Sequence, residues 1–303
     1  MKKTRILEII WWAIALGLVF GCWINAVRGL SGWDWFVFFY PHAQEMDPSW
    51  LWYPLWIYLI LTPISYLPAQ FSYVIFLVIN VCMIWLGSRL TGSNRFAVLI
   101  SFPAFWILWY GQLDGFVLLG VALGLWALQH KKPVAVGVSI LLLLAKPHIG
   151  GPLALIYFLR SMKRDTIMVI GLAFLITMVL WGWDWPLIWI RNLVTLPQAD
   201  LVIHRTNISL YPWGLLAWLV LLIPMSQTEQ AITAISATLL SIPYAPTYSI
   251  LSLLVLPIPW WAYLISSAPF ILGQNGYWIT VFAPLGCIGW IIVSHARSYI
   301  RSS

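Results

Sequence analysis

Apolar runs of about 20 residues recur along this chain, a length that suits a helix crossing a bilayer core. They cover residues 6–27, 71–87, 167–183 and 278–293. Only 8% of the 303 residues are charged and 62% are hydrophobic, a balance that water-soluble domains do not show. The expected fold class is therefore all-α, a polytopic helical membrane protein forming a single integral membrane domain.

Prolines, glycines and charged residues divide the chain further and predict about 12 transmembrane helices, several of them short or broken. Two long segments, 28–69 and 184–209, lie between helices as outer loops, and the short apolar piece 55–67 is expected to lie in the outer interface. Residues 227–303 predict four short helices, because prolines interrupt them repeatedly. The other predicted helices are 6–27, 70–88, 96–110, 115–129, 134–145, 149–160, 166–183 and 210–226.

Lys and Arg residues set the expected orientation, because they accumulate in short cytoplasmic loops. Threading the helices with both termini inside leaves only four of the 16 basic residues outside: Arg28, Lys146, Arg191 and Arg205. Most acidic residues fall on the outer side, although the rule does not require this. We therefore expect a multi-pass protein of the cell membrane with its active site on the outer face.

The net charge of +7 does not indicate nucleic acid, since the basic residues lie between apolar runs and form no single patch. The first run follows Lys2, Lys3 and Arg5 but is long and lacks a small-residue cleavage site, which predicts an uncleaved anchor. Three scattered cysteines indicate neither a disulfide framework nor a metal cluster.

Asp34 is the leading candidate for a catalytic group. It follows the first helix in the sequence Gly-Trp-Asp-Trp-Phe, so aromatic rings surround a carboxylate at the membrane surface. Such a setting favours a raised pKa and a base directed into a cleft. The alternative, a residue that caps an interfacial helix at 35–43, is equally consistent with the sequence.

Lys146 ends the apolar run 134–145 and precedes Pro147 and His148. A lysine at that depth is costly and ordinarily needs an anionic partner or a water-filled cavity. The alternative is that its side chain extends to the interface, but the following proline interrupts the regular helix. The sequence therefore indicates a functional lysine.

Other polar residues of the outer side are weaker candidates. Arg205 and His204 lie beside Asn207 in the second outer loop, where a phosphate site and a solvated loop are both plausible. Asp114 follows Gly111 and Gln112 at a predicted helix start, which favours a capping role. The many Trp residues belong mostly to the interfacial belts, yet aromatic rings gather near Asp34 and would suit the apolar face of a sugar.

The order of these motifs resembles a known family. A first helix is followed by Asp34 and aromatic residues up to Tyr40, then Tyr53-Pro54, Gly111-Gln112, Lys146-Pro147 and finally Pro243-Tyr244 with Tyr248. This order resembles the GT-C-fold glycosyltransferases, in particular the polyprenyl-phosphate-mannose-dependent mannosyltransferases of glycosyltransferase family 87. The chain departs from that family in its short length and in reading Tyr53-Pro54-Leu55 where Tyr-Pro-Pro is usual.

The resemblance implies a GT-C-like fold, with residues 1–183 as the module common to the family and residues 184–303 as a variable set of helices. It implies that Asp34 is the catalytic base and that Lys146, His148, Arg205 and His204 bind the donor phosphate. The implied substrate-binding residues are Trp35, Tyr40, Tyr53, Gln112, Asp114, Asn207, Tyr244 and Tyr248.

The implied partners are a polyprenyl-phosphate sugar donor, a lipid or glycan acceptor and membrane lipids, with no nucleic acid. The sequence contains no nucleotide-phosphate loop, and no cofactor is predicted, although participation of a divalent metal is left open. Two other classes remain: a transporter, for which broken helices and a buried lysine are also expected, and a non-catalytic subunit of a membrane assembly.

Overall fold

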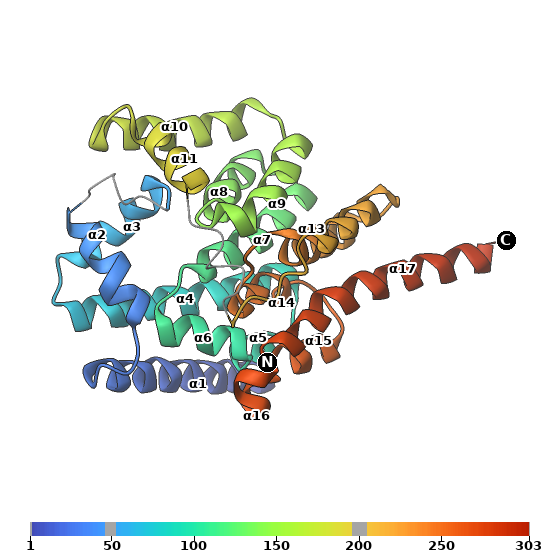
Figure 1. Ribbon diagram of the computed structural model, residues 1–303, viewed down its shortest axis with the longest axis horizontal. Coiled ribbons are helices and arrows are strands. Elements are labelled where there is room, and N and C mark those ends of the chain that lie inside the picture. Colours follow the sequence, from blue (N-terminus) through green and yellow to red (C-terminus); the bar gives the residue numbers. More distant parts are fainter. Residues whose placement is uncertain (1, 46–52, 196–204, 303) are drawn as a thin grey trace.

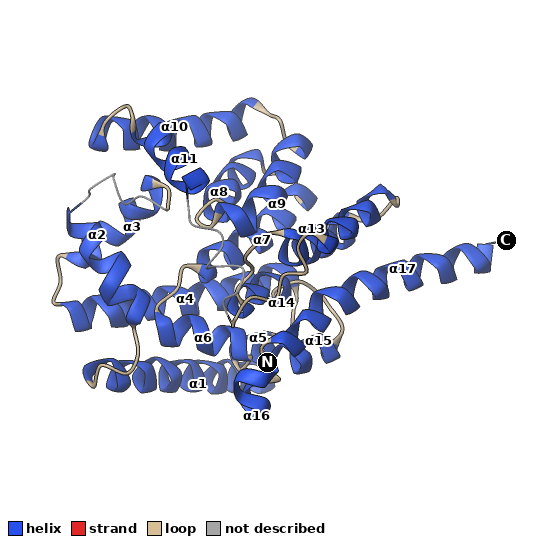
Figure 2. Ribbon diagram, in the orientation of Figure 1, coloured by secondary structure: helices blue, strands red, loops and turns tan. Residues whose placement is uncertain are grey.

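The computed structural model describes residues 2–45, 53–195 and 205–302 of the chain. All the elements of regular secondary structure in this part are helices (Figure 2). Turns and 3₁₀ segments join the sixteen α-helices. The only bridge between extended segments among these residues pairs Asn207 with Pro246. The all-α fold class is thus confirmed.

The first half of the described chain contains nine α-helices and one π-helical turn. The bounds are α1 Lys2–Val27, the π-helical turn η1 Trp35–Phe39, α2 Tyr40–Glu45, α3 Leu55–Ser65, α4 Ala69–Thr91, α5 Arg95–Leu99, α6 Phe102–Tyr110, α7 Asp114–Gln129, α8 Pro133–Leu143 and α9 Pro147–Arg160.

The second half alternates long α-helices with shorter pieces. The bounds are α10 Arg164–Trp181, α11 Trp185–Thr195, the 3₁₀-helix η3 Trp213–Leu222, α13 Gln227–Ser241, η4 Thr247–Ile250, α14 Leu251–Leu254, α15 Trp260–Ser266, α16 Pro269–Leu272, η5 Gly273–Gly276, η6 Trp278–Val281 and α17 Phe282–Ser302.

Helix α7 forms the centre of the molecule and packs against α4, α8, α9, α13 and α14. Small residues on α7 permit this close approach: a Cβ at Gly124 would lie 2.0 Å from the ring of Tyr157, and one at Gly120 only 2.8 Å from the backbone of Leu143. Figure 1 shows α1 along one edge of the molecule and α10 along the opposite edge. The polar start of α7 therefore lies in the interior.

Four of the described helices are long and apolar enough to cross a membrane: Arg5–Val27, Ala69–Thr91, Arg164–Trp181 and Trp278–Arg297. The helix at Arg164–Trp181 leaves most of its apolar side chains exposed, including Leu172 and Val179. Lipid is the solvent that such a surface suits, so a multi-pass membrane protein is the architecture these helices indicate. The predicted count of about 12 spans is not shown, because the remaining helices are shorter.

Several predicted helices differ from the observed ones for local reasons. The predicted helix 96–110 is divided into α5 and α6 at Ser101, whose side chain caps α6 by accepting a hydrogen bond from Ala104 N at 3.3 Å. The predicted helix 210–226 is a 3₁₀-helix over Trp213–Leu222. The C-terminal region contains more short pieces than the four predicted and ends in α17, which is 21 residues long.

Candidate functional site

Asp34 lies in a tight connection between α1 and the π-helical turn η1. Gly29 and Gly32 adopt left-handed φ values of 73° and 79°, which glycine accepts without strain. At Gly32 a Cβ would approach the ring of Phe36 to 2.6 Å, and its backbone N–H donates to Trp109 O at 2.7 Å. The connection is therefore held firmly against the end of α6.

Trp35, the residue after Asp34, anchors this segment in the protein interior. Its side chain is fully buried and its ring stacks on that of Phe76 with centroids 4.4 Å apart. Gly111, in a left-handed conformation at the end of α6, leaves room for Trp35, since a Cβ there would lie 2.8 Å from Trp35 Cβ. A π-helical turn is uncommon and often occurs at functional sites.

Gln112 links Asp34 to the interior. It follows Gly111 in the turn that joins α6 to α7, and its side chain is buried. Its Nε2 donates a hydrogen bond to Asp34 Oδ2, and its Oε1 accepts one from Lys146 Nζ at 2.7 Å. The residues Asp34 and Lys146, which are 112 positions apart in the sequence, thus meet through a single amide.

Lys146 is the centre of the buried polar network. It is 2% exposed and stands before Pro147, where the steric effect of the proline keeps the backbone out of the helical region between α8 and α9. Its Nζ lies 2.6 Å from Asp114 Oδ2 and 4.7 Å from the ring centroid of Tyr248. Asp114 Oδ1 in turn accepts a hydrogen bond from Ser249 Oγ at 2.8 Å. The predicted anionic partner of Lys146 is therefore Asp114.

The environment raises the pKa of Asp34 to about 6. Burial is the largest cause, because it disfavours the charged form. The hydrogen bond from Gln112 and the charge of Lys146 act in the opposite direction, while the charge of Asp114 adds to the increase. A carboxylate with a pKa in this range is ionised at neutral pH and still basic enough to accept a proton.

Asp34 opens into a cavity of about 570 Å³ at the side of η1 and α2. Polar and apolar groups share its walls, an arrangement that suits a ligand with both characters. The lining residues are Asp34, Val37, Phe38, Phe39, His42, Glu45, Tyr53 and Tyr58.

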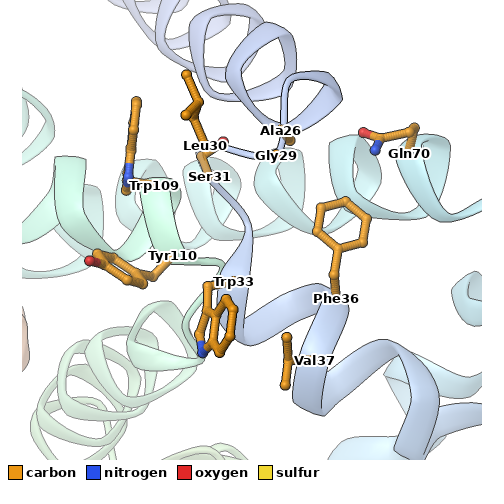
Figure 3. A pocket seen from close by; sticks show the side chains of 10 residues that line it. All are labelled: Ala26, Gly29, Leu30, Ser31, Trp33, Phe36, Val37, Gln70, Trp109 and Tyr110. Atoms are coloured by element: carbon orange, nitrogen blue, oxygen red, sulfur yellow. The ribbon is translucent and has the colours of Figure 1, made fainter.

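A second cavity of about 620 Å³ shares the side chain of Val37 with the first. Figure 3 shows the rings of Trp33, Phe36, Trp109 and Tyr110 around it, with Gln70 at one end. Two cavities consequently meet at the segment that carries Asp34.

Several predicted site residues come together here. Besides Asp34, Gln112, Asp114 and Lys146, the group includes Tyr53 in the cavity wall and Tyr248 against the lysine. Tyr244 is half-buried beside Tyr248, and His148, on the first turn of α9, has an exposed side chain.

Other predicted residues make their hydrogen bonds to partners outside this group. Tyr40 donates to Leu67 O at 3.2 Å, and Asn207 holds the backbone of Pro243 and Ala245 through its amide. Arg205 is exposed and donates to Gln274 Oε1 at 2.8 Å. His204 lies outside the described residues. The substrate and phosphate roles predicted for these residues, and for Trp35, remain predictions.

The sequence predicted that His42 and Glu45 are on the outer side but did not assign them to the site, and it did not point to Tyr58 or Ser249. The positions 34, 38, 42 and 45 have helical spacing, which could have predicted that His42 and Glu45 lie on the face of Asp34. No comparable signal pairs Ser249 with Asp114, since 135 positions separate them. Within the described residues, no three His, Cys, Asp or Glu side chains are grouped as a metal site would require.

Comparison with known proteins gives one match. Residues 50–268 match the model of glycosyltransferase family 87. The matched region contains Tyr53, Gln112, Asp114 and Lys146, whereas Asp34 precedes it. No curated protein and no solved structure matched the chain.

Proposed function

Because the chain belongs to glycosyltransferase family 87, we propose that it transfers a sugar, mannose or a related hexose, from a polyprenyl-phosphate donor to a hydroxyl group of a lipid, glycan or protein acceptor. The observation that carries the proposal is the network that joins Asp34 through Gln112 to the buried pair of Lys146 and Asp114. Asp34 lines a cavity, and the amide of Gln112 connects it to the two buried charges.

The reaction is a single displacement with inversion at the anomeric carbon. Asp34 accepts the proton of the acceptor hydroxyl while the oxygen of that hydroxyl forms a bond to the anomeric carbon. The bond between that carbon and the phosphate oxygen breaks, and polyprenyl phosphate leaves with the electron pair. General-base assistance of this kind is typically worth about 10²–10⁴-fold in rate.

Lys146 and His148 are the groups that we assign to the leaving phosphate, the first by its charge and the second as a hydrogen-bond donor. Lys146 uses two of its three N–H donors on Gln112 and Asp114, and His148 lies two residues further along the chain. We assign the donor phosphate to this end of the site and propose that Arg205 and His204 also bind it. Preorganised charge aimed at the leaving oxygens is a large contribution in transfer reactions.

The membrane supplies the route for both lipid-linked substrates. In our proposal, about 12 segments thread the cell membrane with both termini in the cytoplasm, and the site faces the outer side. The cavity beside Asp34 has apolar walls at Val37, Phe38 and Phe39, which suits an isoprenoid chain arriving from the lipid.

The test is transfer in reconstituted liposomes that contain a radiolabelled polyprenyl-phosphate sugar and a lipid acceptor. Asp34→Asn keeps the size of the side chain but removes the base, so we expect transfer to fall about 10²–10⁴-fold. Glu8→Gln, a matched neutralisation at the other end of α1, keeps wild-type transfer. Full transfer by Asp34→Asn would disprove the role of the base, and a wild-type protein that accepts no polyprenyl-phosphate sugar would disprove the donor class.

A further inference from the structure

Gln112 has a place in the site that goes beyond substrate binding. We infer that Gln112 is a positioning residue, which holds the carboxylate of Asp34 in one orientation, and that Lys146 together with Asp114 determines which end of the Gln112 amide faces it. The inference rests on the proposed function, because it concerns the group that we assign as the base.

The orientation of the Gln112 amide follows from the chemistry of its neighbours. The oxygen and nitrogen of a glutamine side chain have nearly the same shape, so either end can face a partner on steric grounds alone. An ammonium group has only donors, and Lys146 Nζ lies 2.7 Å from one end of the amide. That end must be Oε1, which leaves the N–H donors of Nε2 to face Asp34.

Two further contacts hold the side chain of Lys146 in place. Asp114 Oδ2 holds its Nζ at 2.6 Å, and Ser249 Oγ holds the second oxygen of Asp114 at 2.8 Å. All three of these side chains are almost completely buried. A buried ion pair that lost one partner would leave an uncompensated charge, so the arrangement resists rearrangement.

The two carboxylate oxygens of Asp34 consequently have different roles. Gln112 occupies Oδ2, and within the part of the chain that the structure describes no other side chain is recorded as a donor to this carboxylate. The second oxygen, Oδ1, is then the one available to accept the proton of an acceptor. A base held in one rotamer loses less rate to misorientation than a freely rotating one.

The same contact favours the ionised form of Asp34. The Gln112 hydrogen bond and the Lys146 charge lower the pKa of Asp34, against burial and the Asp114 charge, which raise it. The other titratable groups that face Asp34 are phenols or line its cavity: Tyr53, Tyr73, Tyr110, Tyr244, Tyr248, His42 and Glu45. Gln112 differs from these groups because it donates a hydrogen bond to the carboxylate, so its replacement has a distinctive effect on pH dependence.

The experiment measures sugar transfer against pH in the liposome system. Gln112→Met keeps the length of the side chain and removes the donor. We expect kcat to fall about 10- to 100-fold with little change in the KM of the donor. The acid limb of the profile, near pH 6 in the wild type, should move up by about one pH unit, because a hydrogen bond to a charged group is worth about that much.

Gln112→Glu provides a second variant that keeps the shape and the acceptor for Lys146. It places a second carboxylate against Asp34, so the two groups must share a proton at neutral pH. The acid limb should move up further, by about two pH units, and transfer should recover at high pH. Gln129→Met, which alters a glutamine bonded only weakly to Thr228 at 3.5 Å, is the matched control and leaves the profile unchanged.

The outcomes separate the two proposals. A folded Gln112→Met protein whose acid limb lies at the wild-type pH would overturn the positioning role. If this variant does not fold, an unchanged acid limb in Gln112→Glu would overturn the role instead. These results count against Gln112 alone as long as the wild type transfers sugar and Asp34→Asn does not. Transfer by Asp34→Asn would instead remove the proposed function.

Discussion

Two ion pairs of the described chain differ in what surrounds them. Near the start of α1, Arg95 pairs with Glu8, and the two side chains are 19% and 35% exposed. At the start of α7, in the network that leads to Asp34, Asp114 pairs with Lys146, and these side chains are 1% and 3% exposed. The first pair keeps contact with solvent, whereas the second has lost it.

The difference indicates which pair serves function. Glu8 also accepts a hydrogen bond from Trp85 at 3.2 Å, so the exposed pair joins α1 to α4 and α5. A half-exposed pair of this kind contributes little and costs little. A buried pair carries a large desolvation penalty, and apolar residues of similar size would often be as stable. The retention of charge at Lys146 and Asp114 is therefore better explained by their contact with the base than by stability.

The largest effect is expected from breaking the buried pair. Lys146→Met leaves Asp114 buried without a counter-charge, which should lower the free energy of unfolding by about 3–5 kcal/mol. Unfolding by heat in detergent micelles, followed by circular dichroism, would measure this.

A double variant separates charge from packing. Lys146→Met combined with Asp114→Leu removes both charges, so most of the lost stability should return while transfer stays low. If the double variant is as unstable as the single one, the pair stabilises the fold directly and the contrast with the exposed pair is lost.

The sequence predicted the helical class because apolar runs of membrane length are a strong signal. The cost of a buried lysine also indicated an anionic partner or a water-filled cavity for Lys146, and the order of motifs, through the family resemblance, implied that Asp34 and Lys146 share a site. The sequence could not predict that Gln112 stands between them, since a contact between a turn and two distant helix ends depends on tertiary packing. The sequence also could not predict that residues 213–222 form a 3₁₀-helix, because hydropathy does not distinguish that helix from an α-helix.

The aromatic residues show a second limit. Trp35 and Tyr53 are both aromatic neighbours of Asp34 in the predicted site, yet Trp35 is fully buried while Tyr53 lines the cavity. Trp35 belongs to the π-helical turn Trp35–Phe39, whereas Tyr53 lies just before α3. The different exposure of the two rings therefore depends on tertiary packing, which the sequence does not give.

An intermediate effect is expected when Asp34 itself loses its charge. Its pKa in the folded protein, about 6, lies above the ordinary value of 3.8, so the folded state binds the proton more tightly than the unfolded state. The ionised form therefore costs stability, and this cost appears as the pH rises from about 4 to about 6. Asp34→Asn should be more stable than the wild type by about 1–3 kcal/mol at pH 7.5.

Unfolding temperatures of both proteins at pH 7.5 and pH 4.5 would measure this gap. The gain should shrink at the lower pH, because the wild-type carboxyl is then protonated in the folded state. Equal stability at both pH values would mean that the folded state does not disfavour the charge, and the site would then resemble the exposed pair at the start of α1.

The smallest effect is expected at that exposed pair. Glu8→Gln keeps the size of the side chain and an oxygen that can accept from Trp85, but it removes the charge that faces Arg95. Because the pair is partly solvated, the free energy of unfolding should change by about 0–1 kcal/mol and less at high salt. Thermal unfolding in detergent at low and high salt would measure it beside the transfer assay, in which the variant should match the wild type. A loss as large as that of Lys146→Met would mean that exposure does not distinguish the two pairs, and the charge buried at Lys146 would then need no functional explanation.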